Sequence, residues 1–130
     1  MSVRVFIVDD NTGFREEIRA LLTEQGLEVV GGAGSSTEAL RQIAELRPDV
    51  ALIDIDLSGE SGFELARQVS DQPEKAALTR LILISTHDAA EYAELIETSP
   101  AIGFLAKTEL SAERIRRMLT DLDDRAAEAS

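Results

Sequence analysis

Cysteine is absent from the 130-residue chain, and histidine occurs once, at position 87. Without cysteine the protein can form neither a disulfide framework nor a thiolate metal site, and one histidine cannot build a multi-histidine zinc centre. A metal bound by this chain should therefore be a hard cation held by oxygen atoms, and Mg²⁺ fits best. A chain of this length can bury a sizeable core without cross-links, so one domain is expected.

Long apolar runs and an excess of positive charge are also missing. No apolar stretch approaches the roughly 20 residues that span a bilayer, and the start of the chain matches neither a signal peptide nor a lipidation motif. Thirteen Lys and Arg residues face 25 Asp and Glu residues, which leaves a net charge of −12. Nucleic-acid phosphates and anionic membranes attract positive surfaces, so we expect neither as a direct partner. Because the sequence shows no signal peptide, lipidation motif or membrane span, we expect a cytoplasmic location.

Apolar runs alternate with amphipathic stretches along the chain. Strands are predicted at residues 3–8, 27–33, 49–54, 80–84 and 102–106, and helices at 12–25, 36–46, 63–70, 88–98 and 111–123. Ser35 or Ser36 is the expected cap of the second helix. This alternation predicts an α/β fold in which five helices cover both faces of a five-stranded parallel sheet. The predicted domain spans residues 1–124, and residues 125–130 form a short acidic tail.

Polar side chains follow four of the five predicted strands. They are Asp9 and Asp10, Asp54, Ser85 and Thr86, and Lys107. Each alone could be a turn former, a cap or a surface group, but the carboxyl ends of parallel strands meet at one sheet edge, where ligands bind. Crowded carboxylates repel one another unless a divalent cation, Mg²⁺ or Mn²⁺, neutralises them. Together with a lysine and a hydroxyl, they predict a phosphoryl-transfer site with Asp54 as nucleophile.

Four segments resemble the receiver domain of two-component response regulators. They are VFIVDDN, PDVALIDIDLSGESGFEL, LILISTHD and IGFLAK, in the family's order and across almost the whole chain. The resemblance implies a flavodoxin-like (CheY-like) three-layer sandwich with strand order 2-1-3-4-5. It also implies a phosphoprotein switch that takes a phosphoryl group from a sensor histidine kinase or phosphotransfer protein. Such a domain is no general enzyme, because it catalyses only its own phosphorylation and dephosphorylation.

The resemblance assigns the acidic residues to phosphorylation and Mg²⁺ binding. Asp54 matches the phosphoacceptor, and Asp10 matches a direct metal ligand. Asp9 matches an acid that holds the metal through water, and the backbone carbonyl of Asp56 a further ligand. Ser58 stands where the family usually has proline.

The remaining matched residues concern the phosphoryl group and the conformational switch. Ser85 matches the switch hydroxyl, and Lys107 matches the lysine that pairs with the phosphoryl group. Thr86 lies beside the phosphate position, where the family usually has a small residue. Phe104 matches the aromatic residue whose rotamer reports the active state. The output face expected from this pattern comprises residues 88–98, 102–106 and 111–123, and it would bind a downstream protein or a second copy of the chain.

Several alternatives remain open from the sequence. The start of the chain and its short tail favour a stand-alone receiver, and the alternative is the receiver piece of a longer DNA-binding regulator. The segment Asp54-Ile55-Asp56 also resembles the DxD motif of Mg²⁺-dependent haloacid-dehalogenase-type phosphatases, although that motif normally closes a first strand. Flavodoxins share the topology, but Asp9 and Asp10 would repel a flavin phosphate. A pseudo-receiver is disfavoured because the expected acids, hydroxyl and lysine are all present.

Overall fold

The computed structural model describes residues 2–72, 79–86 and 89–129. Its main sheet contains the parallel strands β1 (Arg4–Val8), β2 (Glu28–Ala33), β3 (Val50–Asp54), β6 (Arg80–Ser85) and β7 (Gly103–Ala106). The strand order is β2-β1-β3-β6-β7. The two remaining strands, β4 (Asp56–Leu57) and β5 (Glu60–Ser61), form a separate antiparallel hairpin. Counting only the main sheet, this is the predicted order 2-1-3-4-5, so the expected fold class is confirmed.

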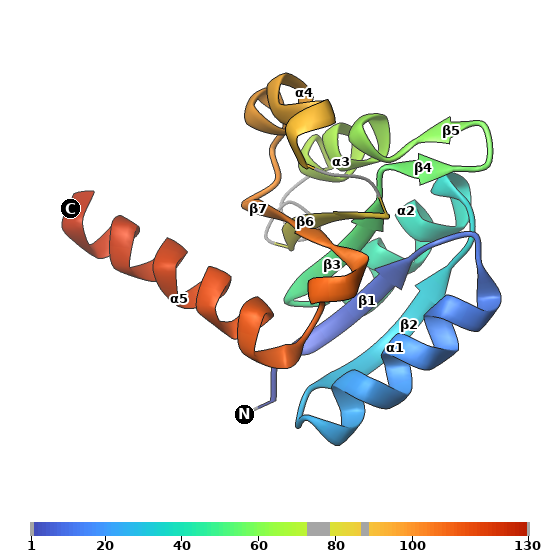
Figure 1. The fold of residues 1–130 in the computed structure, drawn as a ribbon, viewed down its shortest axis with the longest axis horizontal. Helices are drawn as coiled ribbons and strands as arrows, with labels where there is room; N and C mark the ends of the chain where they lie inside the picture. Colours follow the sequence, from blue (N-terminus) through green and yellow to red (C-terminus); the bar gives the residue numbers. More distant parts are fainter. Residues whose placement is uncertain (1, 73–78, 87–88, 130) are drawn as a thin grey trace.

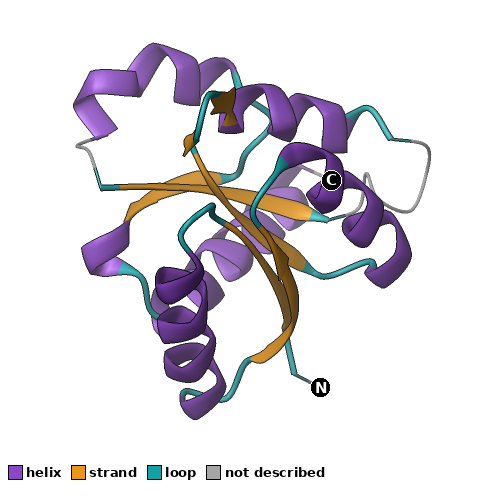
Figure 2. Ribbon diagram, turned by 90° about the vertical axis from the view of Figure 1, so that its right-hand side faces the viewer, coloured by secondary structure: helices purple, strands orange, loops and turns teal. Residues whose placement is uncertain are grey.

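Helices lie on both faces of the sheet (Figures 1 and 2). The α-helices are α1 (Thr12–Glu24), α2 (Ser36–Leu46), α3 (Gly62–Ser70), α4 (Ala93–Thr98) and α5 (Ala112–Ala129), and the short 3-10 helices are η2 (Ala89–Tyr92) and η3 (Lys107–Glu109). Ser35 caps α2, as one of the two predicted alternatives. In the described part of the chain, no helix is both long enough and apolar enough to cross a membrane.

Two predicted helix boundaries were wrong. The fourth helix, expected over residues 88–98, is divided into η2 and α4, because the backbone at Tyr92 (φ −123°, ψ 16°) departs from helical geometry. Residue 88 lies outside the described residues. The last helix continues to Ala129 instead of ending near Asp123, and the added segment contains Arg, Ala and Glu, which favour helix. The domain boundary at residue 124 stays a prediction.

The core consists of two apolar layers, one on each face of the sheet. Side chains of a strand alternate between faces, so Ala51 and Ile53 of β3 pack into the layer beneath α2 and α3, while Val50 and Leu52 pack into the layer beneath α1 and α5. The five residues of β3 are all buried, and the strand is paired on both sides. Its last residue, Asp54, therefore lies at the sheet edge at the end of a buried strand that is paired on both sides.

The chain turns sharply after β3 to form the β4–β5 hairpin and then α3. Gly62, the first residue of α3, donates its N–H to the Ile55 carbonyl at 3.0 Å. A Cβ at position 62 would overlap the backbone carbonyl oxygen of Asp54 and lie 2.7 Å from Ile55 Cα. Only glycine lets the start of α3 lie this close to the end of β3. The hairpin is thereby held against the edge that carries Asp54.

Candidate functional site

A polar cavity of about 240 Å³ opens at the carboxyl edge of the sheet. Its lining residues are Asp9, Asp10, Asn11, Asp54, Asp56, Ser58, Ser85, Thr86 and Lys107. This set contains all the predicted site residues except Phe104. The structure therefore brings together residues from the ends of β1, β3, β6 and β7, as expected for parallel strands.

Lys107 lies between two buried carboxylates. Its Nζ is 2.6 Å from Asp9 Oδ2 and 2.9 Å from Asp54 Oδ2. Asp9 is fully buried and Asp54 is 6% exposed. The other oxygen of each carboxylate accepts a backbone N–H, from Asn11 at 2.9 Å for Asp9 and from Asp56 at 3.0 Å for Asp54. Buried charges require such pairing, and both acids are held in fixed orientations by it.

The backbone around Asp9 is anchored by α1. Asn11 caps this helix by accepting the Phe14 N–H at 3.1 Å, and the guanidinium of Arg15 donates to the Asp9 carbonyl oxygen. Gly34 leaves room for this contact, because a Cβ there would lie 3.0 Å from Arg15 Nη1. The N-terminal end of α1 therefore positions the first acidic pair, and its partial positive charge favours carboxylates there.

The pairing and burial change the proton affinities of Asp54 and Lys107. Burial raises the pKa of Asp54 above its usual 3.8, against the opposing effects of the Asp56 amide and the Lys107 ammonium. Burial alone would lower the pKa of Lys107, but its hydrogen bonds to Asp9 and Asp54 outweigh this effect and raise the pKa above 10.5. Lys107 is therefore a permanent cation at neutral pH, and ionised Asp54 is held at a cost in free energy.

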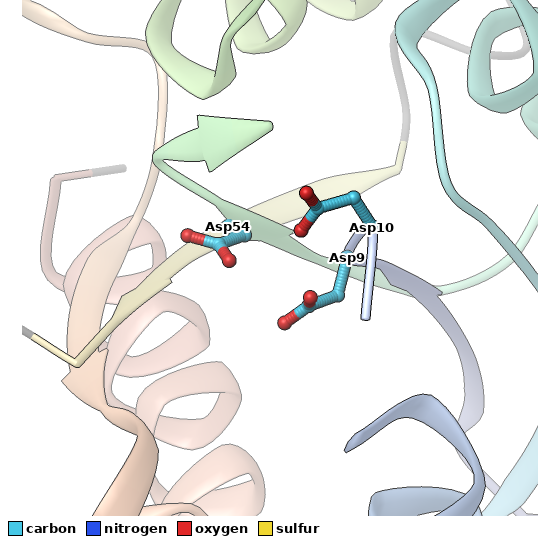
Figure 3. Close-up of side chains that lie close together, drawn as sticks. All are labelled: Asp9, Asp10 and Asp54. Atoms are coloured by element: carbon cyan, nitrogen blue, oxygen red, sulfur yellow. The ribbon is translucent and has the colours of Figure 1, made fainter. Parts of the chain in front are cut away.

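Asp10 completes a cluster of three carboxylates, shown side by side in Figure 3. One oxygen from each of Asp9, Asp10 and Asp54 lies within 4.8 Å of the others. Asp10 is exposed, and its carboxylate accepts a hydrogen bond from the Ser58 hydroxyl. One ammonium faces these three negative groups, so the cluster keeps an excess of negative charge. The donor set, its spacing and this charge fit a hard divalent cation such as Mg²⁺.

The predicted switch residues Ser85 and Phe104, and the predicted phosphate-site residue Thr86, occupy different positions. Ser85 is buried at the end of β6, and Thr86 is exposed at the cavity. Phe104 is half-buried and packs against the apolar layer beneath α2 and α3, together with Tyr92 and Ile96 of η2 and α4. Phe104 therefore lies within the predicted output face and is not among the residues that line the cavity. His87 is outside the described residues.

Three contacts of the site were missed by the sequence analysis. The Phe14 ring lies under the Lys107 ammonium, with Nζ 4.3 Å from the ring centroid, which is a cation–π distance. Asn11 lines the cavity and caps α1. Ser58 reaches Asp10 across 48 residues of sequence. The available signals were the position of Phe14 one turn after Asp10 and that of Asn11, a preferred capping residue, directly before the predicted helix. The Ser58 contact depends on loop geometry.

The raised pKa of Asp54 predicts that replacing this acid by its neutral isostere stabilises the cation-free fold. The pKa of Asp54 is higher in the folded protein than the value of 3.8 expected in the unfolded chain. The free energy of unfolding therefore falls as the pH rises from the unfolded pKa through the folded pKa, because Asp54 then ionises in the folded protein at a cost. Asp54→Asn should therefore have the larger free energy of unfolding at neutral pH. Its advantage should disappear below the unfolded pKa. Urea unfolding in chelator, with exposed Asp56→Asn as control, measures this, and a less stable Asp54→Asn at neutral pH would contradict it.

Known proteins share both this sequence and this structure. The sequence model of the response regulator receiver domain matches residues 5–120. The DNA-binding transcriptional activator DevR/DosR of Mycobacterium tuberculosis is 36% identical over 137 residues, which cover 98% of this chain and 60% of DevR/DosR. LiaR, a transcriptional regulatory protein of Bacillus subtilis, is 32% identical and is covered over 52% of its length. The chain spans about half the length of the curated relatives it matches.

Solved structures agree with this assignment. The signal receiver domain of the response regulator NarL from Mycobacterium tuberculosis has a TM-score of 0.73 and 36% identity, covering 90% of this chain and 96% of that domain. The chemotaxis response regulator CheY4 of Vibrio cholerae has a TM-score of 0.76 and 26% identity, with 93% and 98% covered. Sequence and fold lead to the same conclusion: this chain belongs to the response regulator receiver domain family.

Proposed function

We propose that Asp54 accepts a phosphoryl group in a Mg²⁺-dependent reaction and that the added group switches the conformation of this domain. Phosphorylation of an aspartate is typical of the family, and receiver domains bind Mg²⁺ at an acidic cluster. The observation that carries the proposal is the contact of Lys107 Nζ with Asp54 Oδ2 at 2.9 Å, in a cavity that also holds Asp9 and Asp10. A nucleophile, an ammonium and cation ligands thus meet at one point.

Phosphoryl transfer at Asp54 requires no proton from the nucleophile. One carboxylate oxygen forms a bond to phosphorus while the bond between phosphorus and the donor breaks, and its electron pair leaves with the donor. For a phosphohistidine donor the broken bond is P–N, and the product is an acyl phosphate. Asp10 and Asp54, the Asp56 carbonyl and Asp9 through water would hold the cation. Bound Mg²⁺, or Mn²⁺ in its place, would offset the charge of the phosphoryl oxygens.

Lys107 and the two hydroxyl residues act after transfer in this proposal. The Lys107 ammonium exchanges part of its contact with Asp54 for the new phosphoryl oxygens, which carry more negative charge. Ser85 then bonds a phosphoryl oxygen and draws the end of β6 inward, while Thr86 borders the phosphate. Phe104 packs beside Tyr92 and Ile96, so a change at β6 repacks the surface formed by α4, β7 and α5.

We infer that this surface passes the signal to a protein. Leu95 of α4 is 47% exposed, Met118 of α5 is half-buried, and Arg114 and Arg117 of α5 are exposed. An apolar centre with a polar rim suits a downstream protein or a second copy of the chain. Receiver domains interact with histidine kinases, so a cytoplasmic sensor kinase or phosphotransfer protein is the proposed donor. The net charge of −12 supports protein contacts over direct nucleic-acid contacts by these residues.

Family membership favours this function over the phosphatase and flavin alternatives. The Asp56 N–H donates to Asp54 Oδ1, and the Asp56 residue is exposed, so this second acid of the DxD segment lacks the buried setting that would tune it as an acid catalyst. The carboxylates of Asp9 and Asp10 disfavour a flavin phosphate at this edge. We propose a switch that catalyses only its own phosphorylation and dephosphorylation. DNA binding is named for a longer relative, DevR/DosR, and we do not propose it for the residues of this chain.

Phosphorylation should depend on Asp54 and on a divalent cation. Incubation with acetyl phosphate and Mg²⁺ should add one labile phosphoryl group by intact-mass analysis, because the cation offsets the repulsion between the acids and the phosphodonor. Asp54→Ala and the wild type in EDTA should remain unmodified. Asp56→Asn keeps the backbone carbonyl and should still be labelled. Normal labelling of Asp54→Ala would disprove the assignment.

The switching role of Lys107 and Ser85 can be separated from phosphorylation itself. Lys107→Ala and Ser85→Ala should still bind beryllofluoride or accept some phosphoryl group, but they should lose the conformational response around residues 89–117. Backbone amide NMR shifts with and without beryllofluoride measure that response. Shifts in either variant equal to those of the wild type would rule out the proposed role of that residue.

A further inference from the structure

The tip of the β4–β5 hairpin carries a serine in an unfavourable backbone conformation. Asp56 pairs with Ser61 and Leu57 with Glu60, which leaves a two-residue loop of Ser58 and Gly59. Both loop residues have positive φ, +44° for Ser58 and +89° for Gly59. Two-residue loops of this kind favour Asn, Asp or Gly at their first position. Turn formation alone therefore does not explain a serine at position 58.

The side chain of Ser58 has a specific partner in the acidic cluster. Its hydroxyl donates to Asp10 Oδ2. Asp9 and Asp54 are each fixed by a backbone N–H and by Lys107. Across residues 2–72, 79–86 and 89–129, Ser58 supplies the only hydrogen bond to the Asp10 carboxylate. Without this bond the exposed Asp10 side chain could adopt other rotamers.

The hairpin that carries Ser58 is itself anchored on two sides. Leu57 is 1% exposed, and Gly62 bonds the Ile55 carbonyl at the hairpin base. On the other side, Glu60 Oε1 accepts the Ser36 N–H at 3.1 Å, at the first residue of α2. The Ser58 hydroxyl therefore has a defined position, and the hairpin joins the acidic cluster to the N-terminus of α2.

We propose that Ser58 is a positioning residue for the cation site: its hydroxyl orients Asp10 for Mg²⁺ and couples cation binding to the hairpin and α2. The inference rests on the proposed function, since it concerns the same Mg²⁺ site. A hydroxyl that bonds Oδ2 would leave Oδ1 of Asp10 available to the cation. Groups that orient a metal ligand in this way commonly change metal affinity when they are removed.

The test measures Mg²⁺ affinity by isothermal titration calorimetry and stability by urea unfolding in the same variants. Ser58→Gly removes the hydroxyl but suits a positive φ, so its affinity should fall about tenfold while its unfolding midpoint is unchanged or raised. Gly59→Ala is the matched control, because a Cβ there contacts nothing within 4 Å but is strained at φ +89°. Its midpoint should fall while its Mg²⁺ affinity stays near that of the wild type.

Coupling through the hairpin has its own signal in backbone NMR. In the wild type, Mg²⁺ should shift the amide resonances of Ser58, Gly59 and Ser36, and the Ser36 shift should disappear in Ser58→Gly. Equal Mg²⁺ affinity in Ser58→Gly and wild type would overturn this inference alone, as would an equal loss in Gly59→Ala. A wild type with no saturable Mg²⁺ binding, indistinguishable from Asp10→Asn, would instead contradict the proposed function.

Discussion

The Lys107 ammonium between the carboxylates of Asp9 and Asp54, at 2.6 and 2.9 Å, is the contact around which this site is built. Two carboxylates buried this close together would be strongly destabilising without a cation. Lysine supplies one positive charge, and Asp10 adds a third negative one. The protein therefore stabilises the acidic cluster without neutralising it, and the remaining charge favours Mg²⁺ and, with it, a phosphoryl group.

The fold provides these groups through parallel strands that end at one edge. β3 is buried and paired on both sides and ends at Asp54, whereas Lys107 follows β7, two strands away in the sheet. Asp9 is fixed by the start of α1, through Asn11 and the Arg15 guanidinium. The hairpin that carries Ser58 reaches the same edge, where Ser58 contacts Asp10. Each charged group of the cluster is thus held by a different element. A change in charge within the acidic cluster therefore acts on several elements at once.

Much of the fold and site was predictable because both depend on simple periodic patterns. A buried parallel strand appears in the sequence as an apolar run. The polar residue at its end, such as Asp54 or Lys107, must lie at the carboxyl edge that all parallel strands share. The β4–β5 hairpin was not predicted, since Ser58 has a positive φ although serine is not among the residues that favour this turn position. The Phe14 contact with Lys107 depends on side-chain direction, which an apolar pattern does not specify. The break at Tyr92 is marked by neither glycine nor proline between residues 89 and 98, so no signal in the sequence indicated it.

The central claim is that the uncompensated charge of the three acids creates the cation site. Urea unfolding over a series of Mg²⁺ concentrations at constant ionic strength tests it directly, because a ligand that binds only the folded state stabilises it by mass action. Above the dissociation constant, the free energy of unfolding of the wild type should rise by about 1.4 kcal/mol for each tenfold increase in Mg²⁺, and Asp10→Asn should show a much smaller rise at the same concentrations. A flat wild-type curve, or the same rise in Asp10→Asn, would contradict the claim.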